Sequence, residues 1–246
     1  MIAVSIVSHG HGEMVKTLVA QLIELPQVSQ VILTINIPEQ LDFEPSDKIT
    51  IVSNVTPKGF GSNHNAAFKF CNTEFFCVLN PDISFESNPF AKLVQDLDGY
   101  SADAVAPLVV NKEGGIEDSV RYFPTIPALF RKLLFGYQNR YSVIANSKTF
   151  SPEWVAGMFM LFTSSAYQKL SGFDERYFLY YEDVDICVRL WRSGFRLVAD
   201  PAVTVVHDAQ RASRRNFHHM TLHLSSMSRY LITQSWRLPK IQLSDK

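Results

Sequence analysis

In the first half of the chain, apolar runs rich in β-branched residues alternate with segments whose apolar residues recur at helical spacing. Strands are expected over residues 2–7, 31–35, 49–52, 75–79 and 104–110. Helices are expected over 15–23 and 90–97, and the segment 59–68 turns into a further helix. Short strands separated by helices predict βαβ units, and so an α/β fold: a mainly parallel, Rossmann-like central sheet flanked by helices.

The second half of the chain is less regular at first. Residues 111–151 contain Gly114-Gly115, Pro124 and Pro127 and predict only a short helix at 128–135, so we interpret them as an insertion or lid over the carboxyl ends of the strands. Beyond them we expect an extended segment at 154–162, helices at 165–170 and 183–193, and strands at 195–198 and 203–206. A last helix, 213–236, carries an apolar stripe formed by Phe217, Met220, Leu224, Met227 and Leu231.

The composition narrows the class of protein. Hydrophobic residues make up 46% and charged residues 19% of the 246 residues, which excludes a disordered or collagen-like chain. No apolar run reaches the roughly 18 residues that a membrane span needs, and the start lacks the basic leader of a signal peptide. Cys71, Cys77 and Cys187 form no CxxC pair. Free thiols in a reducing cytosol are therefore expected, and with them a cytoplasmic location.

Charge is distributed unevenly along the chain. From residue 211 onward there are seven Lys or Arg and one acid, a net charge of +6, which leaves −7 for the preceding 210 residues. We therefore expect a domain at 1–210 followed by a basic amphipathic tail at 211–246. The tail packs on the domain or on a second copy in a homodimer, or it makes peripheral contact with anionic lipid of the inner membrane. The acidic domain argues against a nucleic-acid partner.

Asn80-Pro81-Asp82 directly follows the apolar run 76–79. In open α/β sheets ligands bind beyond the carboxyl ends of strands, where one carboxylate can hold Mg²⁺ or Mn²⁺ together with diphosphate oxygens. The alternative interpretation of these three residues is an ordinary turn in which the Asp82 carboxylate is solvated. Gly59 and Gly61 precede a helix, where glycine allows close backbone approach and the helix N-terminus favours anions. A simple loop is the other interpretation of these glycines.

A second group of acids, Glu182, Asp183 and Asp185, begins a predicted helix behind several aromatic residues. Carboxylates favour a helix N-terminus for structural reasons alone, but aromatic walls can also raise a carboxylate pKa or stack on a sugar ring. Because Arg189 lies one turn after Asp185, we expect an ion pair there and a structural role for Asp185. Asp183 is the functional candidate. Together the two acidic groups predict metal-assisted chemistry on a phosphate-bearing substrate.

Three histidines extend this set. His207 closes the predicted strand 203–206, where a histidine is usually ordinary but can also be a metal ligand. His9 and His11 lie in the first loop between strand and helix, so at least one of them is expected to face a ligand.

Taken in order, these segments resemble the family 2 glycosyltransferases of the GT-A fold, in particular bacterial rhamnosyltransferase-like members. The likeness rests on Val4–His9, on Gly59-Phe-Gly61 with Asn65, and on Leu79–Asp82. It continues through the segments 154–161, 172–175 and 180–189 and the strand that ends at His207.

This resemblance implies roles for individual residues. Asp82 is the metal ligand with His207 as a second one, the cation being Mg²⁺ or Mn²⁺, and Asp183 is the catalytic base. Donor-binding residues are Ser8, His9, Asn36, Gly59, Gly61, Asn65 and Asn80. Acceptor-binding residues are Trp154, Gly157, Asp174, Glu175 and Glu182.

The implied activity is inverting transfer of a sugar from a nucleotide-diphosphate donor, such as dTDP-rhamnose or a UDP-hexose. The implied acceptor is a hydroxyl of a glycan or of a polyprenyl-diphosphate-linked sugar in cell-surface polysaccharide synthesis. One position departs from the family pattern: Ile35 stands where the family has an Asp that contacts the nucleotide base, and only Asn36 of that pair remains.

Two other classes remain as alternatives. A sugar-phosphate nucleotidyltransferase would need a long glycine-rich loop bearing Arg or Lys after its first strand, and residues 8–12 contain no such cation. A non-catalytic sugar-nucleotide-binding protein of the same fold would lose the base, whereas Asp82 and Asp183 are both present here.

Overall fold

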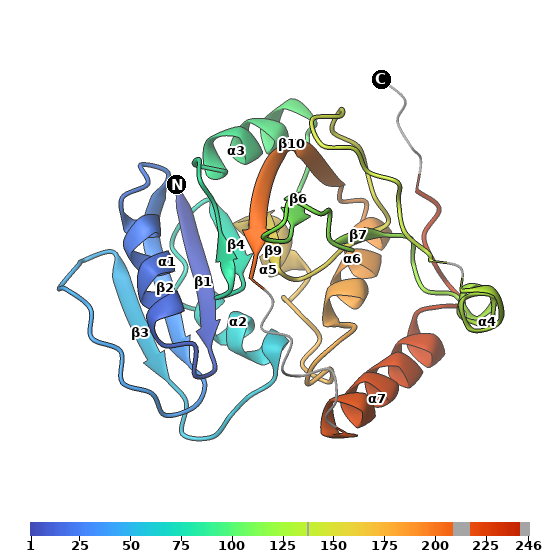
Figure 1. The fold of residues 1–246 in the computed structure, drawn as a ribbon, viewed down its shortest axis with the longest axis horizontal. Helices are drawn as coiled ribbons and strands as arrows, with labels where there is room; N and C mark the ends of the chain where they lie inside the picture. Colours follow the sequence, from blue (N-terminus) through green and yellow to red (C-terminus); the bar gives the residue numbers. More distant parts are fainter. Residues whose placement is uncertain (137, 209–216, 242–246) are drawn as a thin grey trace.

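The computed structural model describes residues 1–136, 138–208 and 217–241. Its centre is an eight-stranded sheet in the order β3-β2-β1-β4-β9-β6-β10-β5 (Figure 1). The strands are β1 Ile2–Ser8, β2 Val28–Ile35, β3 Ile49–Ser53, β4 Phe75–Leu79, β5 Ile83–Ser84, β6 Ala104–Val110, β9 Phe159–Thr163 and β10 Leu197–His207. Pairing is parallel except for β9, which runs antiparallel to β4 and β6, and the short β5 against β10. The predicted mainly parallel α/β sheet is confirmed.

Helices cover both faces of this sheet because successive strand residues point to opposite sides. In β4, for example, Cys77 and Leu79 face one core cluster while Phe76 and Val78 face the other. The first cluster is closed by α1 Glu13–Ile23 and α3 Phe90–Gly99. The second is closed by α2 Phe60–Phe68, α5 Ser164–Lys169 and α6 Glu182–Arg192. Every residue of β4 and β6 is buried, as expected for strands covered on both sides.

Two sequence expectations in the second half are wrong. The strands expected at 195–198 and 203–206 form one strand, β10, whose register against β6 shifts between Asp200 and Thr204. The bulge absorbs Pro201, which cannot donate to the ladder, so the strand continues past it. The extended segment expected at 154–162 is interrupted at 156–158. Its first part, β8 Trp154–Val155, pairs with β7 Val120–Arg121 in a separate ribbon.

The described residues of the central segment contain one helix, α4 Ile126–Phe135. The Thr125 Oγ1 caps its start by accepting a hydrogen bond from the Ala128 N–H at 3.2 Å. Gly136 ends it in the left-handed region at φ 65°, where glycine is not strained. Figure 1 shows α4 at the edge of the molecule, near one end of the last helix, α7 Phe217–Thr233.

Helix α7 packs on the domain through one side. Ser226 and Tyr230 are buried, and so is Gln234 just past the end of the helix. Met220 and Leu224 of the expected apolar stripe are 54% and 50% exposed. Residues 211–216 and 242–246 of the predicted tail, with four of its seven basic residues, lie outside the described residues. In the described part of the chain, no helix combines the length and hydropathy that a bilayer crossing requires.

Candidate functional site

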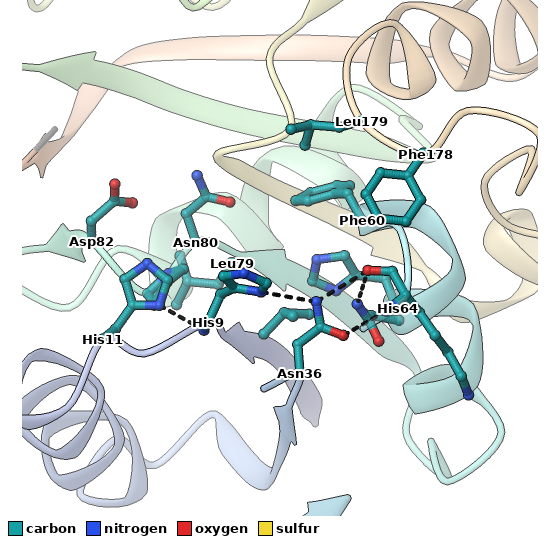
Figure 2. Close-up of a pocket in the computed structure, with 14 residues that line it drawn as sticks. His9, His11, Asn36, Phe60, His64, Leu79, Asn80, Asp82, Phe178 and Leu179 are labelled. Atoms are coloured by element: carbon teal, nitrogen blue, oxygen red, sulfur yellow. Dashed lines mark hydrogen bonds between the residues drawn. The ribbon is translucent and has the colours of Figure 1, made fainter. Parts of the chain in front are cut away.

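The first cavity opens where β1, β2 and β4 end. It has a volume of about 250 Å³. Figure 2 shows His9 and His11 after β1, Asn36 after β2, and Asn80 and Asp82 after β4 around this opening. Parallel strands place their carboxyl ends along one edge, so loops distant in sequence converge on one ligand-sized space. The rest of the lining includes Lys58, Phe60, His64, Phe178 and Leu179.

The side chain of Asn36 fixes one edge of this cavity. Its Oδ1 accepts hydrogen bonds from the Asn54 Nδ2 and from the Lys58 N–H, both at 2.9 Å. Its Nδ2 donates to the Lys58 carbonyl at 3.1 Å and lies 3.2 Å from His9 Nδ1. The amide therefore holds the backbone of the 54–58 loop in place, so that Lys58 and His9 line the cavity.

His207 is not among the residues that line the first cavity, but it links Glu117 to Asp82, which does line it. Its Nε2 lies 3.1 Å from Asp82 Oδ2, and its Nδ1 lies 2.7 Å from Glu117 Oε2. Burial alone would lower the pKa of His207, but the hydrogen bond and charge of Asp82, followed by Glu117, raise it to about 9. The surroundings thus favour positive charge between the two carboxylates. These contacts join His207 to residues 125 and 90 positions away in the chain.

The donor atoms here suit a hard divalent cation. Asp82 Oδ1 is buried and has no hydrogen-bond partner among the described residues. No group of three or more His, Cys, Asp or Glu side chains in the described residues is arranged to hold a metal by itself. One carboxylate and one imidazole, with phosphate oxygens and water completing the shell, match the ligand preferences of Mg²⁺ or Mn²⁺. Asp82 therefore fits a cation that arrives with an anionic ligand, and His207 can join it as a ligand once the cation replaces the proton that Asp82 and Glu117 favour.

His64 lies below the cavity in a different state. It is buried, its Nδ1 lies 2.8 Å from Ser5 Oγ, and burial lowers its pKa to about 3. A neutral imidazole packed edge-on against Phe60, with ring centroids 4.5 Å apart, belongs to the floor of the cavity. Burial also lowers the pKa of His11, against a smaller opposing effect of Asp82.

A second cavity, of about 360 Å³, lies beside the start of α6. Its lining combines Glu182 and Asp183 with Trp154 and with Arg121 from β7. Tyr122, Tyr180 and Tyr181 supply aromatic walls, and α4 and α7 contribute further lining residues. The guanidinium carbon of Arg121 lies 5.7 Å from the centre of the Trp154 ring. Aromatic faces with a few charged groups are typical of a saccharide-binding pocket.

Asp183 is held at the inner end of this cavity by backbone donors. Its Oδ2 accepts from the Gly157 N–H at 3.1 Å and its Oδ1 from the Val184 N–H at 2.8 Å. Burial raises its pKa above the ordinary 3.8, and these hydrogen bonds and Arg121 oppose the shift only in part. A carboxylate with fixed geometry and a raised pKa has the properties of a general base.

The neighbouring acids differ from Asp183. Glu182 is buried, its Oε2 has no partner among the described residues, and burial together with Asp183 raises its pKa well above the ordinary value. Asp185 points into the core, where its Oδ2 accepts from the Arg189 Nε at 2.7 Å and its Oδ1 from the Gln234 Nε2 at 2.5 Å. The expected Asp185–Arg189 ion pair is confirmed.

The two cavities meet at a narrow boundary. A Cβ on Gly157 would lie 3.2 Å from the Phe60 ring and 3.6 Å from the Asp183 Cβ, so Phe60 of the first cavity lies close to Asp183 of the second. The segment 178–181 also lines both: Phe178 and Leu179 face the first, and the two following tyrosines face the second. Those two tyrosines have φ values of 71° and 66°, in the left-handed region that costs energy for large residues.

The remaining predicted residues lie behind this site and line neither cavity. Ser8 is buried under the first loop. A Cβ on Gly59 would meet the Phe178 carbonyl, and one on Gly61 would meet the Phe173 side chain, each at 2.6 Å. Asn65 accepts from the Phe173 N–H at 2.9 Å and donates to Glu175 at 3.0 Å. These glycines and Asn65 therefore hold the 172–181 segment against α2.

Asp174 also lines neither cavity and instead contacts Arg176 near the protein surface. Its carboxylate forms two-pronged hydrogen bonds with Arg176, which lower its pKa. The contacts of Asp174, Asn65 and Glu175 therefore give these residues a structural role in the 172–181 segment.

Sequence reasoning missed Arg121, Tyr122 and Lys58, because the sequence around them carries no recognisable motif. A β-ribbon pairing brings the first two to Asp183, and only the pairing reveals them.

Known proteins resemble this chain in sequence. Residues 27–223 match the model of the family described as glycosyltransferase like family 2. Rhamnosyltransferase WbbL of Escherichia coli K12 is 28% identical over 246 residues, covering 94% of this chain and 92% of that protein. The N-acetylglucosaminyl-diphospho-decaprenol L-rhamnosyltransferase of Mycobacterium tuberculosis is 27% identical over 68% of this chain, and the match spans 58% of its length.

Solved structures share the fold at lower identity. GalNAc-T7, determined with UDP, GalNAc and Mn²⁺, gives a TM-score of 0.63 at 13% identity, covering 85% of this chain and 44% of that one. The mannosyltransferase PcManGT of Pyrobaculum calidifontis, with GDP-Man and Mn²⁺, gives 0.57 at 15% identity, covering 93% and 64%. This chain therefore spans less than two thirds of either solved chain.

Proposed function

Because the chain belongs to glycosyltransferase family 2, with the central sheet of GT-A glycosyltransferases, we propose that it is an inverting hexosyltransferase. Its donor is a nucleotide-diphosphate sugar, with dTDP-rhamnose the first candidate, and its acceptor is a hydroxyl of a lipid-linked glycan. The observation that carries the proposal is Asp183, a backbone-held carboxylate of raised pKa at the boundary between two cavities.

The donor is assigned to the first cavity. Asp82 and His207 would hold Mg²⁺ or Mn²⁺ there, since their atoms fit a hard cation. Such an ion supplies Lewis-acid compensation of charge on a leaving diphosphate. The chain's own contribution is positional: the Asn36 network fixes His9 and Lys58 at the side of the cavity opposite Asp82.

The acceptor is assigned to the second cavity, where its hydroxyl would meet Asp183. The carboxylate takes the hydroxyl proton while the hydroxyl oxygen forms a bond to the anomeric carbon. The bond from that carbon to the diphosphate oxygen breaks, and the leaving group departs with its electron pair. Since attack comes from the acceptor cavity and departure occurs toward the donor cavity, a single displacement inverts the anomeric centre. General-base assistance of this kind contributes roughly 10²–10⁴-fold.

Support for a rhamnosyl donor and a lipid-linked acceptor comes from the relatives. One is named a rhamnosyltransferase and covers nearly the whole chain. Another is named for rhamnosyl transfer to N-acetylglucosaminyl-diphospho-decaprenol. The lipid carrier of such an acceptor keeps it at a membrane, where we place this reaction, on the cytoplasmic side.

The test is the Asp183→Asn variant, assayed with dTDP-rhamnose and N-acetylglucosaminyl-diphospho-polyprenol in the presence of Mn²⁺. We expect transfer to fall by roughly 10²–10⁴-fold, with donor binding by calorimetry within about twofold of the unmodified protein. Asn retains a carbonyl oxygen for one of the two backbone donors, so the site stays folded. Retained transfer, or loss of donor affinity in its place, would remove Asp183 from the role of base.

A further inference from the structure

Helix α4 turns its apolar stripe away from the protein. Ile126, Phe130, Leu133 and Leu134 follow the i, i+4, i+7, i+8 pattern of one helix face, and they are 52%, 59%, 80% and 68% exposed. At about 100° per residue the buried Ala128 lies on the opposite side. A surface helix of a globular domain normally buries such a stripe. Here it forms a contiguous exposed patch, which marks an interaction surface.

The two ends of α4 are defined by local signals. Thr125 caps the start of the helix and Gly136 ends it in a left-handed conformation, so both ends carry their own signals. The helix is anchored to the protein on the side of the buried Ala128, and the exposed apolar face is available to a partner.

The charges and position of α4 indicate which partner it fits. Its ten residues include Arg131 and Lys132 and no acid. Ala128, Leu129 and Lys132 line the second cavity, so the helix forms one wall of the pocket that contains Asp183. An apolar stripe flanked by cations is the pattern of a helix that lies in the plane of an anionic lipid surface.

We propose that α4 docks on an anionic phospholipid bilayer through Ile126, Phe130, Leu133 and Leu134. Docking places the wall of the second cavity at the depth of the lipid headgroups. A lipid-linked acceptor can then keep its chain in the bilayer while its diphosphate lies beside Lys132 and its sugar reaches Asp183. The delivery of acceptor rests on the proposed function, whereas the docking itself does not.

A second copy of this chain is a less suitable occupant of the stripe. A two-fold interface on α4 would bring the basic residues of one copy close to the same residues of the other, a repulsive arrangement. It would also place protein across a wall of the acceptor cavity. The basic tail, to which the sequence assigned lipid contact, is a different element: described residues of α7 pack on the domain through Tyr230 and Ser226.

The experiment compares flotation of the full chain with vesicles of phosphatidylethanolamine and phosphatidylglycerol, and with vesicles of phosphatidylcholine. We expect the unmodified protein to float with the anionic vesicles and the double variant Leu133→Glu/Leu134→Glu to lose about tenfold or more of that binding. Both side chains are largely exposed, so the fold is retained. Val55→Glu, at a fully exposed apolar residue between β3 and α2, is the matched control and should float normally.

Activity of the same variants separates docking from catalysis. With dTDP-rhamnose and a water-soluble short-alkyl analogue of N-acetylglucosaminyl diphosphate, the double variant should match the unmodified protein. With the polyprenyl-linked acceptor in vesicles, its KM should rise about tenfold or more while kcat is retained. If the unmodified protein transfers sugar to neither acceptor, the proposed function fails while flotation still decides the role of α4.

Three results would overturn the docking. The first is equal flotation of the double variant and the unmodified protein. The second is loss of flotation in Ile232→Glu, at an exposed residue of α7, with none in the α4 variant. The third is a dimer in sedimentation velocity that the α4 substitutions dissociate while flotation stays unchanged.

Discussion

Asp185→Asn tests whether the three acids at the start of α6 divide into a structural and a functional set. Asp185 is fully buried and accepts from Arg189 and Gln234. Arg189 in turn donates to the Leu170 and Gly172 carbonyls at 2.7 Å and 2.9 Å. The Asp185 carboxylate thus links α6 to the loop after α5, through Arg189, and to Gln234 in the segment that follows α7. An asparagine amide must direct its NH₂ group at one of two donors, and it leaves the guanidinium without its counter-charge.

The expected loss is that of a broken buried ion pair, about 3–5 kcal/mol. For a domain of this size each kcal/mol lowers Tm by about 2–4 °C, so Asp185→Asn should melt roughly 6–20 °C lower. Differential scanning calorimetry, with urea unfolding at 25 °C for the free energy, measures both. The matched variant Asp183→Asn removes a charge that its surroundings disfavour and keeps one backbone hydrogen bond. Its cost should be about 1 kcal/mol.

The two variants should therefore have opposite effects on activity and stability. Asp183→Asn should lose transfer and melt only about 2–4 °C lower, whereas Asp185→Asn should lose more stability and keep measurable transfer below its melting temperature. The reasoning is refuted if Asp185→Asn melts within about 2 °C of the unmodified protein, or if Asp183→Asn is the less stable of the two.

Three further predictions concern the site. The raised pKa of Asp183 should move the acidic limb of kcat/KM above the ordinary 3.8, because activity requires the ionised form and falls as pH drops through the raised value; a pH profile with a limb at or below 3.8 would contradict this. EDTA should abolish transfer and added Mn²⁺ should restore it, whereas Asp82→Asn should bind Mn²⁺ weakly by calorimetry; unchanged Mn²⁺ affinity would exclude Asp82 as a ligand. Gly59→Ala should cost about 1–3 kcal/mol in urea unfolding, because its Cβ meets the Phe178 carbonyl. Gly99→Ala, whose Cβ contacts nothing among the described residues, should not.

Much of the fold could be predicted from local patterns, because strands that are buried on both faces appear in the sequence as continuous apolar runs. The strands at 75–79 and 104–110 were predicted at the bounds observed, and the spacing of Asp185 and Arg189 predicted their ion pair. The prediction failed at Pro201, where a bulge carries β10 through a residue that normally ends a strand. It also failed at 156–158, where one extended segment divides between two sheets.

The sequence by itself determined the candidates for the chemistry: an acid after β4, a second acid at the start of α6, and a family pattern linking them. Tertiary structure alone decided which of those residues meet. His207 reaches Asp82 and Glu117 because β10 and β5 are paired, and Arg121 reaches the Asp183 cavity because β7 pairs with β8. The outward orientation of α4 was likewise invisible in its periodicity, since an amphipathic pattern defines a face but not what lies against it. Periodicity is set by neighbours a few residues apart, whereas convergence depends on strand order, which no local pattern encodes.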